Sequence, residues 1–100
     1  MKTFAVLAEP TRRLLLDSLL EGAQSVNSLV DRIGMSQPVV SKHLRILRDA
    51  GLVLVKPDGQ RRLYSVSPAP LAELEAWLEP YRKLWNERLN SLEEHLDEME

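Results

Sequence analysis

The sequence of 100 residues predicts a mainly α-helical domain that carries one small β-hairpin. Two observations predict this fold class. Apolar residues recur at spacings of three and four over most of the chain, which is the period of an amphipathic helix. Between residues 52 and 66 the pattern becomes extended, and Pro57-Asp58-Gly59-Gln60 in its middle has the composition of a tight turn. We expect about five helices and one hairpin within a single domain that spans residues 1–100.

Two short helices are expected first. Residues 3–8 form one, and Pro10 begins the next because its missing N–H costs nothing in the first turn of a helix. Gly22 is expected to end this second helix. Its expected core residues are Leu14, Leu15 and Leu19. Its first turn, Thr11-Arg12-Arg13, has two equally supported interpretations: a phosphate site at the helix N-terminus, or a capping threonine followed by solvent-exposed arginines.

The next two helices are joined by a turn of only three residues. The first runs from Ser25 to Ile33 and stops at Gly34, and the second runs from Ser36 to Ala50 before Gly51. The second helix has an apolar stripe of Val40, Leu44 and Leu47. Its polar and basic residues are Gln37, Ser41, Lys42, Arg45 and Arg48. Two helices joined in this way, the second with a basic outer face, are the signature of a helix-turn-helix.

The hairpin is expected to pair residues 52–56 with residues 61–66. Pro57 suits the first central position of a type I turn and Asp58 the second, while Gly59 can take the positive φ of a bulge. Tyr64 and Val66 share the face that should pack on the domain. Alternation puts Arg62 on that face as well, with an outward turn expected only at the end of the strand. A helix-turn-helix followed by such a hairpin is a winged helix.

The last helix carries an apolar stripe from Leu71 to the end of the chain, and Pro80 is its one strong breaker. We expect a kink or a break near residues 77–80. The earlier helices already close a winged-helix core, so segments 1–8 and 71–100 are expected to form a homodimer interface. The predicted dimerisation residues are Phe4, Leu7, Leu74, Leu78, Tyr81, Trp85, Leu89 and Leu92. The stripe also includes Leu96 and Met99, and the alternative is a helix that folds back on its own domain.

The net charge of −2 is unevenly distributed along the chain. Residues 36–64 hold six basic and two acidic side chains, a net +4, whereas residues 71–100 hold three basic and nine acidic ones, a net −6. Residues 1–35 are neutral overall. Such a separation would orient the protein as it approaches DNA. An ordinary solvated face explains the acidic half equally well.

Composition excludes several classes of protein. Without cysteine there is no disulfide, thiolate metal site or cysteine redox switch. Four glycines at turns and two separated histidines supply no nucleophile with a base and no phosphate loop, so we expect no enzyme. Glu9, Pro10 and the arginines after them interrupt the first apolar run too early for a signal peptide, and no transmembrane run occurs. The expected location is cytoplasmic, without membrane attachment.

Four motifs together resemble the ArsR-type winged-helix repressors. They are Leu7-Ala8-Glu9-Pro10-Thr11-Arg12-Arg13, the stretch from Ser36-Gln37-Pro38 to His43-Leu44, Leu47-Arg48-Asp49-Ala50-Gly51-Leu52-Val53, and Gly59-Gln60-Arg61-Arg62-Leu63-Tyr64-Ser65-Val66. The resemblance implies a homodimeric repressor of transcription that binds an inverted-repeat operator. It is closest to members that lack metal sites. The rival interpretations are a winged helix used only for protein contacts and a metal-responsive repressor.

The metal sites implied by the resemblance are incomplete here. The cysteine site of the third helix is impossible in residues 26–32. The site in the last helix needs Asp-x-His from one subunit and His-x-x-Glu from the other. His95 and Glu98 supply the second half, but residues 82–84 read Arg-Lys-Leu where the first half should lie. A tetrahedral zinc shell cannot be closed by these donors, so no metal or other cofactor is expected.

The predicted DNA-binding residues lie on helix 36–50 and on the wing, residues 53–66. They are Ser36, Gln37, Pro38, Ser41, Lys42, Arg45, Lys56, Gln60 and Arg61. Glutamine can pair bidentately with adenine, and serine can bond any base. Two neighbours on the helix are ambiguous: Val39 is favoured as partly core over a thymine-methyl contact, and Arg48 suits a phosphate contact or a surface ion pair. His43 is expected to pack and hydrogen-bond, not to bind metal.

Overall fold

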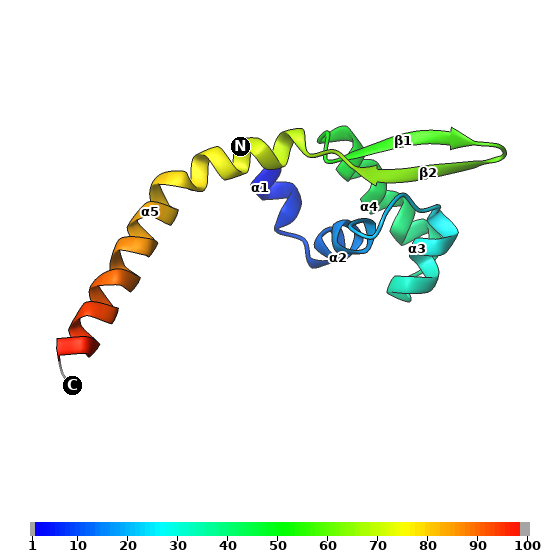
Figure 1. Ribbon diagram of the computed structural model, residues 1–100. Coiled ribbons are helices and arrows are strands. Elements are labelled where there is room, and N and C mark those ends of the chain that lie inside the picture. Colours follow the sequence, from blue (N-terminus) through cyan, green and yellow to red (C-terminus); the bar gives the residue numbers. More distant parts are fainter. Residues whose placement is uncertain (1, 99–100) are drawn as a thin grey trace.

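The computed structural model describes residues 2–98 and confirms the mainly helical fold with one two-stranded antiparallel sheet. The elements are α1 (Lys2–Leu7), α2 (Pro10–Leu19), α3 (Val26–Ile33), α4 (Gln37–Asp49), β1 (Val53–Asp58), β2 (Arg61–Val66) and α5 (Ala69–Glu98). Helices α2 to α4 gather beside the hairpin, whereas α5 leaves the domain (Figure 1). The molecule is therefore elongated, at 64 × 26 × 21 Å, with the hairpin tip and the end of α5 at opposite ends.

The core lies where α2, α3 and α4 meet the start of β1. Its fully buried side chains are Leu15, Leu29, Val40, Leu44, Leu47, Leu52 and Val53. The prediction that Leu14 belongs to this core is wrong, because its side chain is 48% exposed and Leu16 is buried in its place. Neighbouring residues on a helix point about 100° apart, so they cannot all face α3 and α4. Gly22 lies beyond the end of α2, where its N–H donates to the Leu19 carbonyl.

The end of α4 shows why a glycine is needed after Ala50. Gly51 has φ +77°, and its N–H donates to the Arg48 carbonyl at 2.9 Å. The Leu52 N–H donates to the Leu47 carbonyl, also at 2.9 Å. These two bonds form a Schellman motif, which fixes the direction in which the chain leaves α4 for β1. At the other end, Ser36 is the N-cap as predicted but makes no side-chain capping bond.

The hairpin turn differs from the prediction. Asp58 pairs with Arg61, so the loop is the two residues Gly59 and Gln60, and Pro57 lies within β1 opposite Arg62. Gly59 has φ +64° while no non-glycine residue in the described chain has positive φ, which matches a type II′ turn. Such turns match the twist of paired strands. In a hairpin with a two-residue loop, the residue pair next to the loop is hydrogen-bonded, and here that pair is Asp58 and Arg61. The next pair, Pro57 and Arg62, is not hydrogen-bonded, so Pro57 loses no ladder bond there.

Two arginines of α2 hold the end of α1. The Arg12 Nε donates to the Val6 carbonyl, and Arg13 Nη1 donates to the Leu7 and Ala8 carbonyls at 2.7 and 3.0 Å. These carbonyls at the C-terminus of a helix have no intrahelical partners, and the guanidinium groups satisfy them. Neither predicted role for these arginines describes this arrangement. The N-cap of α2 is Glu9, whose carboxyl pKa is lowered by the hydrogen bond from the Thr11 backbone N–H.

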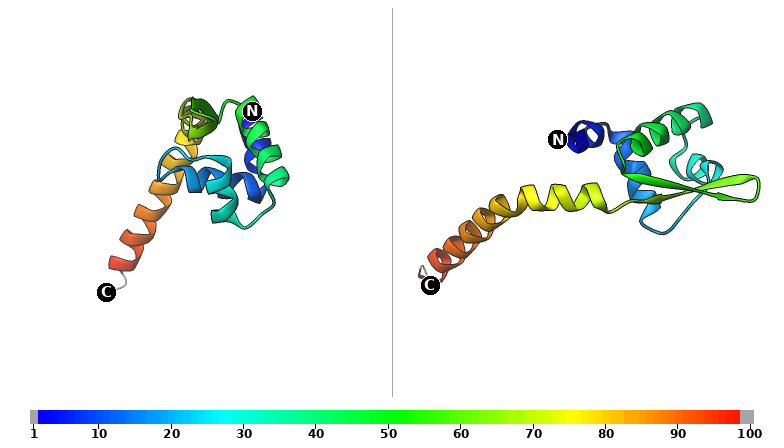
Figure 2. Two further views of the ribbon diagram at one scale, coloured as in Figure 1. Left: turned by 90° about the vertical axis from the view of Figure 1, so that its right-hand side faces the viewer. Right: turned by 90° about the horizontal axis from the view of Figure 1, so that it is seen from above.

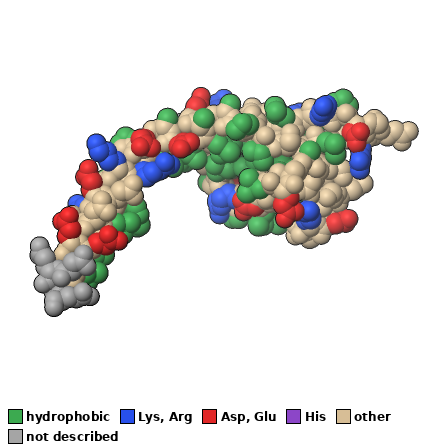
Figure 3. All heavy atoms as spheres, viewed as in Figure 1, with side chains coloured by type: hydrophobic (Ala, Val, Ile, Leu, Met, Phe, Trp, Pro, Cys, Tyr) green, Lys and Arg blue, Asp and Glu red, His purple; other side chains and the backbone are tan. Residues whose placement is uncertain are grey.

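Helix α5 is continuous through Pro80, so of the two expected outcomes, a kink or a break, the break does not occur. Figure 2 shows that the helix axis changes direction between its first and second halves, which agrees with a kink. The first half meets α1, where the rings of Phe4 and Trp77 lie edge to face with centroids 5.0 Å apart. Every side chain from Glu75 to Leu96 is exposed. Hydrophobic side chains gather where α5 leaves the domain and again along the inner edge of its projecting half (Figure 3).

Candidate nucleic-acid interface

The residues predicted to bind DNA from α4 lie on its solvent-facing side. Ser36, Gln37, Pro38, Lys42 and Arg45 are exposed, and Ser41 is half-buried. The opposite side of α4 is fully buried against α2 and α3 through Val40, Leu44 and Leu47. Packing of that side therefore fixes which polar residues face outward.

Three other residues of α4, namely Val39, Arg48 and His43, had predictions of their own. The preference for Val39 as partly core is wrong, since it is 40% exposed and the adjacent Val40 takes the inward position. Arg48 Nε lies 3.7 Å from the Asp49 carboxylate, which supports the surface ion pair. His43 is half-buried, and its Nδ1 accepts a hydrogen bond from Arg12 Nη1 at 3.5 Å. His43 thus packs and hydrogen-bonds between α4 and α2, as the sequence predicts.

The wing, which we define as β1, β2 and their loop, presents Lys56, Gln60 and Arg61 to solvent near its tip. Arg61 also forms an ion pair across the turn, because its Nη2 lies 3.1 Å from the Asp58 carboxylate. Arg62 is exposed and lies next to the loop end of β2, which is the outward turn expected at the end of the strand. The hairpin tip extends beyond the helices, and no other element among residues 2–98 covers it (Figure 1). Tyr64 and Val66 do pack against the core.

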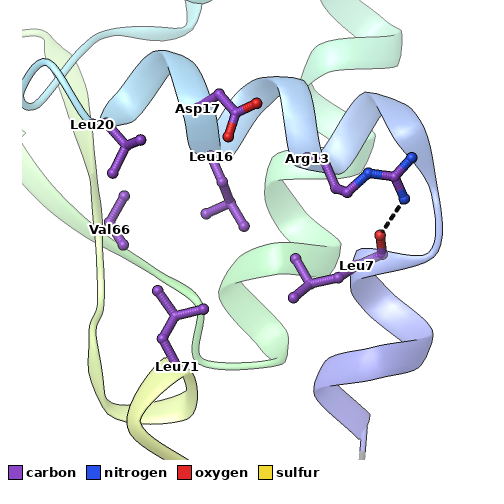
Figure 4. A pocket seen from close by; sticks show the side chains of 7 residues that line it. All are labelled: Leu7, Arg13, Leu16, Asp17, Leu20, Val66 and Leu71. Carbon is purple, nitrogen blue, oxygen red and sulfur yellow. Dashed lines mark hydrogen bonds between the residues drawn. The ribbon is translucent and has the colours of Figure 1, made fainter. Parts of the chain in front are cut away.

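Two hollows flank β2. A groove of about 310 Å³ lies between the wing and the start of α3, and most of the residues that line it are of polar type: Ser25, Val26, Asn27, Gln60, Arg61, Arg62 and Tyr64. An apolar cavity of about 320 Å³ lies on the side of α1 and α5. Figure 4 shows its lining of five aliphatic side chains with Arg13 and Asp17, where Arg13 turns toward the Leu7 carbonyl. This lining offers one lone carboxylate and no nucleophile.

The donor set does not fit a zinc ion. Within the part of the chain that the structure describes, no three His, Cys, Asp or Glu side chains come together as a metal site would need. His95 lies on the exposed, projecting half of α5, and the side chain of Glu98 lies outside the described residues. Separately, none of the helices from residue 2 to residue 98 is long and apolar enough to span a membrane.

Comparison with known proteins finds a matching family profile and several related sequences. A sequence profile of the bacterial regulatory proteins of the arsR family matches residues 9–54. An HTH-type transcriptional regulator of Mycobacterium tuberculosis is 33% identical over 96 residues, which cover 96% of this chain and 87% of that protein. Seven other curated relatives match over 63 to 72 residues, and the chain spans 50 to 60% of their lengths.

Solved structures agree with the sequence relatives. An ArsR-like transcriptional regulator from Rhodococcus is 32% identical with a TM-score of 0.72, and the match covers 90% of this chain and 85% of that one. A homodimeric winged helix-turn-helix DNA-binding domain from Mycobacterium bovis is 28% identical with a TM-score of 0.64, covering 79% and 73%. The TM-scores show that both neighbours share the overall fold of this chain, and the second is itself a winged helix-turn-helix domain.

Proposed function

Because the chain belongs to the arsR family of bacterial regulatory proteins, we propose that it is a sequence-specific DNA-binding repressor that acts as a homodimer on an inverted-repeat operator. The observation that carries this proposal is the exposed polar and basic face of α4, held outward by a fully buried opposite face. A bacterial regulator of this kind works in the cytoplasm, where the DNA lies.

In this proposal α4 enters the major groove with its N-terminal end foremost. Gln37 reads adenine, and Ser41 bonds a neighbouring base edge. Lys42 and Arg45 contact guanine or phosphate further along the same face. Ser36 and Pro38 begin the helix and bring its first turn to the backbone.

The wing adds contacts beside the recognition helix. Lys56, Gln60 and Arg61 meet the phosphate backbone or the minor groove from the exposed tip of the hairpin. The ion pair with Asp58 holds the Arg61 guanidinium at the tip in the free protein. On DNA, a phosphate then competes with or joins this carboxylate.

The homodimer is supported by the projecting half of α5. Its residues Tyr81, Leu84, Trp85, Leu89, Leu92 and Leu96 are all exposed, and Trp85 is 65% exposed. An apolar stripe of this length is stabilised when it is buried, and a second copy of the same stripe is the simplest cover. Within one chain Phe4 packs on Trp77, and Leu7 and Leu74 are half-buried, so these residues join the rim of that interface. Two recognition helices would then meet successive major grooves about 34 to 36 Å apart.

A salt titration tests this function against its rival, a winged helix used only for protein contacts. A duplex selected from a random pool and a scrambled duplex of equal length are titrated at several salt concentrations. We expect tighter binding to the selected duplex and a steep loss of affinity with salt for both. Equal, salt-insensitive weak binding to both duplexes would contradict DNA binding as the function.

A further inference from the structure

Gln24 is a buried polar residue that no motif singled out. It lies in the loop between α2 and α3 and is 9% exposed. Its side-chain Nε2 donates to the Ser18 carbonyl near the end of α2. Its Oε1 accepts from Ser28 Oγ in α3 at 3.0 Å. The side chain of Gln24 therefore ties the loop to the helices on both sides of it.

The backbone of Gln24 faces a different element. Its N–H donates to the Tyr64 carbonyl at 3.0 Å, and its carbonyl accepts from the Tyr64 N–H at 2.8 Å. Tyr64 lies in β2 and pairs with Val55 of β1 on its other edge. Gln24 thus acts as a third strand one residue long, at the root of the wing.

This arrangement links the wing to the helix-turn-helix. A two-stranded hairpin is marginally stable by itself, so its direction depends on what holds its edges. Side-chain bonds to α2 and α3 fix the Gln24 backbone, and that backbone fixes Tyr64. The Gln24 side chain is buried and both of its bonds are partly shielded from water, so losing the side chain leaves the Ser18 carbonyl and the Ser28 hydroxyl without their partner.

We propose that Gln24 is a positioning residue for DNA binding, which sets the wing at its angle to α4 without touching DNA. This inference rests on the proposed function for its DNA readout. It goes beyond the family's DNA-contacting residues, because it assigns the geometry of the wing to a buried side chain of this chain.

The first experiment measures amide hydrogen exchange of the DNA-free protein. In Gln24→Ala we expect the Tyr64 amide to exchange at least about tenfold faster, while amides of α4 keep their protection. Ser28→Ala removes only one of the two side-chain bonds and should give a smaller increase. Ala23→Ser, a neutral change at the exposed neighbouring position, serves as the control. An unchanged Tyr64 rate in both Gln24→Ala and Ser28→Ala overturns the proposal.

The second experiment is a pair of double-mutant cycles on the selected duplex, at a temperature where all variants are folded. Gln24→Ala should weaken binding about fivefold, and adding it to Arg61→Ala should weaken binding much less than fivefold further, because the wing is already impaired. Adding it to Gln37→Ala should keep the full fivefold loss. Full additivity with Arg61→Ala, or normal affinity of Gln24→Ala, overturns the positioning role. A wild-type protein that binds no duplex contradicts the proposed function instead.

Discussion

Gln37 Nε2 donates a hydrogen bond to Ser41 Oγ over 3.2 Å, one turn further along the exposed face of α4. The two residues proposed to read bases are therefore already oriented by each other in the free protein. Preorganised side chains lose less conformational freedom on binding. Residues that share a hydrogen bond are also coupled, so the effects of changing them are not expected to add.

The first prediction is that Gln37→Ala and Ser41→Ala relax sequence preference while the fold stays intact. Each should cost about 1 to 3 kcal/mol on the preferred duplex and little on a scrambled one. The double variant should lose less than the sum of the two single losses. Competition binding with both duplexes measures this, and equal weakening on the two would show that neither residue reads sequence.

The second prediction concerns the wing. Arg61→Ala should weaken binding to all duplexes alike and lower the salt slope by about one unit, as expected for one lost phosphate contact. The matched variant Asp58→Asn removes the partner carboxylate and should tighten binding at low salt, because a negative charge leaves the tip. An unchanged slope for Arg61→Ala would remove Arg61 from the interface, and Lys56→Ala would be tested next.

The third prediction is that DNA affinity depends on α5, although α5 makes no DNA contact in this account. Trp85→Ala with Leu89→Ala should yield a monomer, since truncation of an interface anchor commonly costs more than about 1 kcal/mol. The monomer loses the linked second half-site and should bind a palindrome no better than its separate halves. Sedimentation and binding to whole and half operators measure both effects.

The control for that variant is Leu54→Ala, which truncates a leucine that is 56% exposed on β1, outside the apolar stripe of α5. It should leave the dimer intact. The wild-type protein should be a dimer at micromolar concentration. A wild-type monomer, or full operator affinity in the Trp85 and Leu89 double variant, would mean that the apolar stripe of α5 is not buried in a homodimer interface.

The fourth prediction tests the junction between α4 and the wing. Gly51→Ala should destabilise the fold by about 1 to 2 kcal/mol, because a side chain strains the left-handed conformation at φ +77°. Gly51→Asn should lose less, since asparagine tolerates this region better. In thermal unfolding the wild-type protein should have the highest melting temperature, followed by Gly51→Asn and then by Gly51→Ala. An alanine variant as stable as wild type would show that Gly51 relaxes out of this conformation.

The sequence predicted the elements whose signals are local. Caps and apolar periods identified α3, α4 and α5 to within two residues of the observed bounds. Strand pairing depends on residues that are distant in the sequence, so the strand register was missed. The predicted turn was centred on Pro57 and Asp58, whereas the observed loop is Gly59 and Gln60. Leu14 was misplaced because apolar character alone does not tell which of several adjacent leucines faces the core.

The candidate site was predicted less completely than the fold. The exposed face of α4 follows from its buried face, so its polar residues could be identified from the period. The ion pair of Arg61 with Asp58 depends on the turn, and the Trp77 contact depends on where α1 lies. Gln24 carries no periodic or motif signal at all, because its role arises only when α2, α3 and β2 are assembled.

Selection of bound duplexes from a random DNA pool at one fixed salt concentration shows whether the protein is a dimeric, sequence-specific DNA-binding repressor. We expect enrichment of an inverted repeat whose half-site centres lie about one helical turn, 34 to 36 Å, apart. Enrichment should disappear with the Gln37 and Ser41 double alanine variant. A pool that stays random with the wild-type protein, or one that yields a single half-site without symmetry, would contradict the proposed dimeric, sequence-specific repressor.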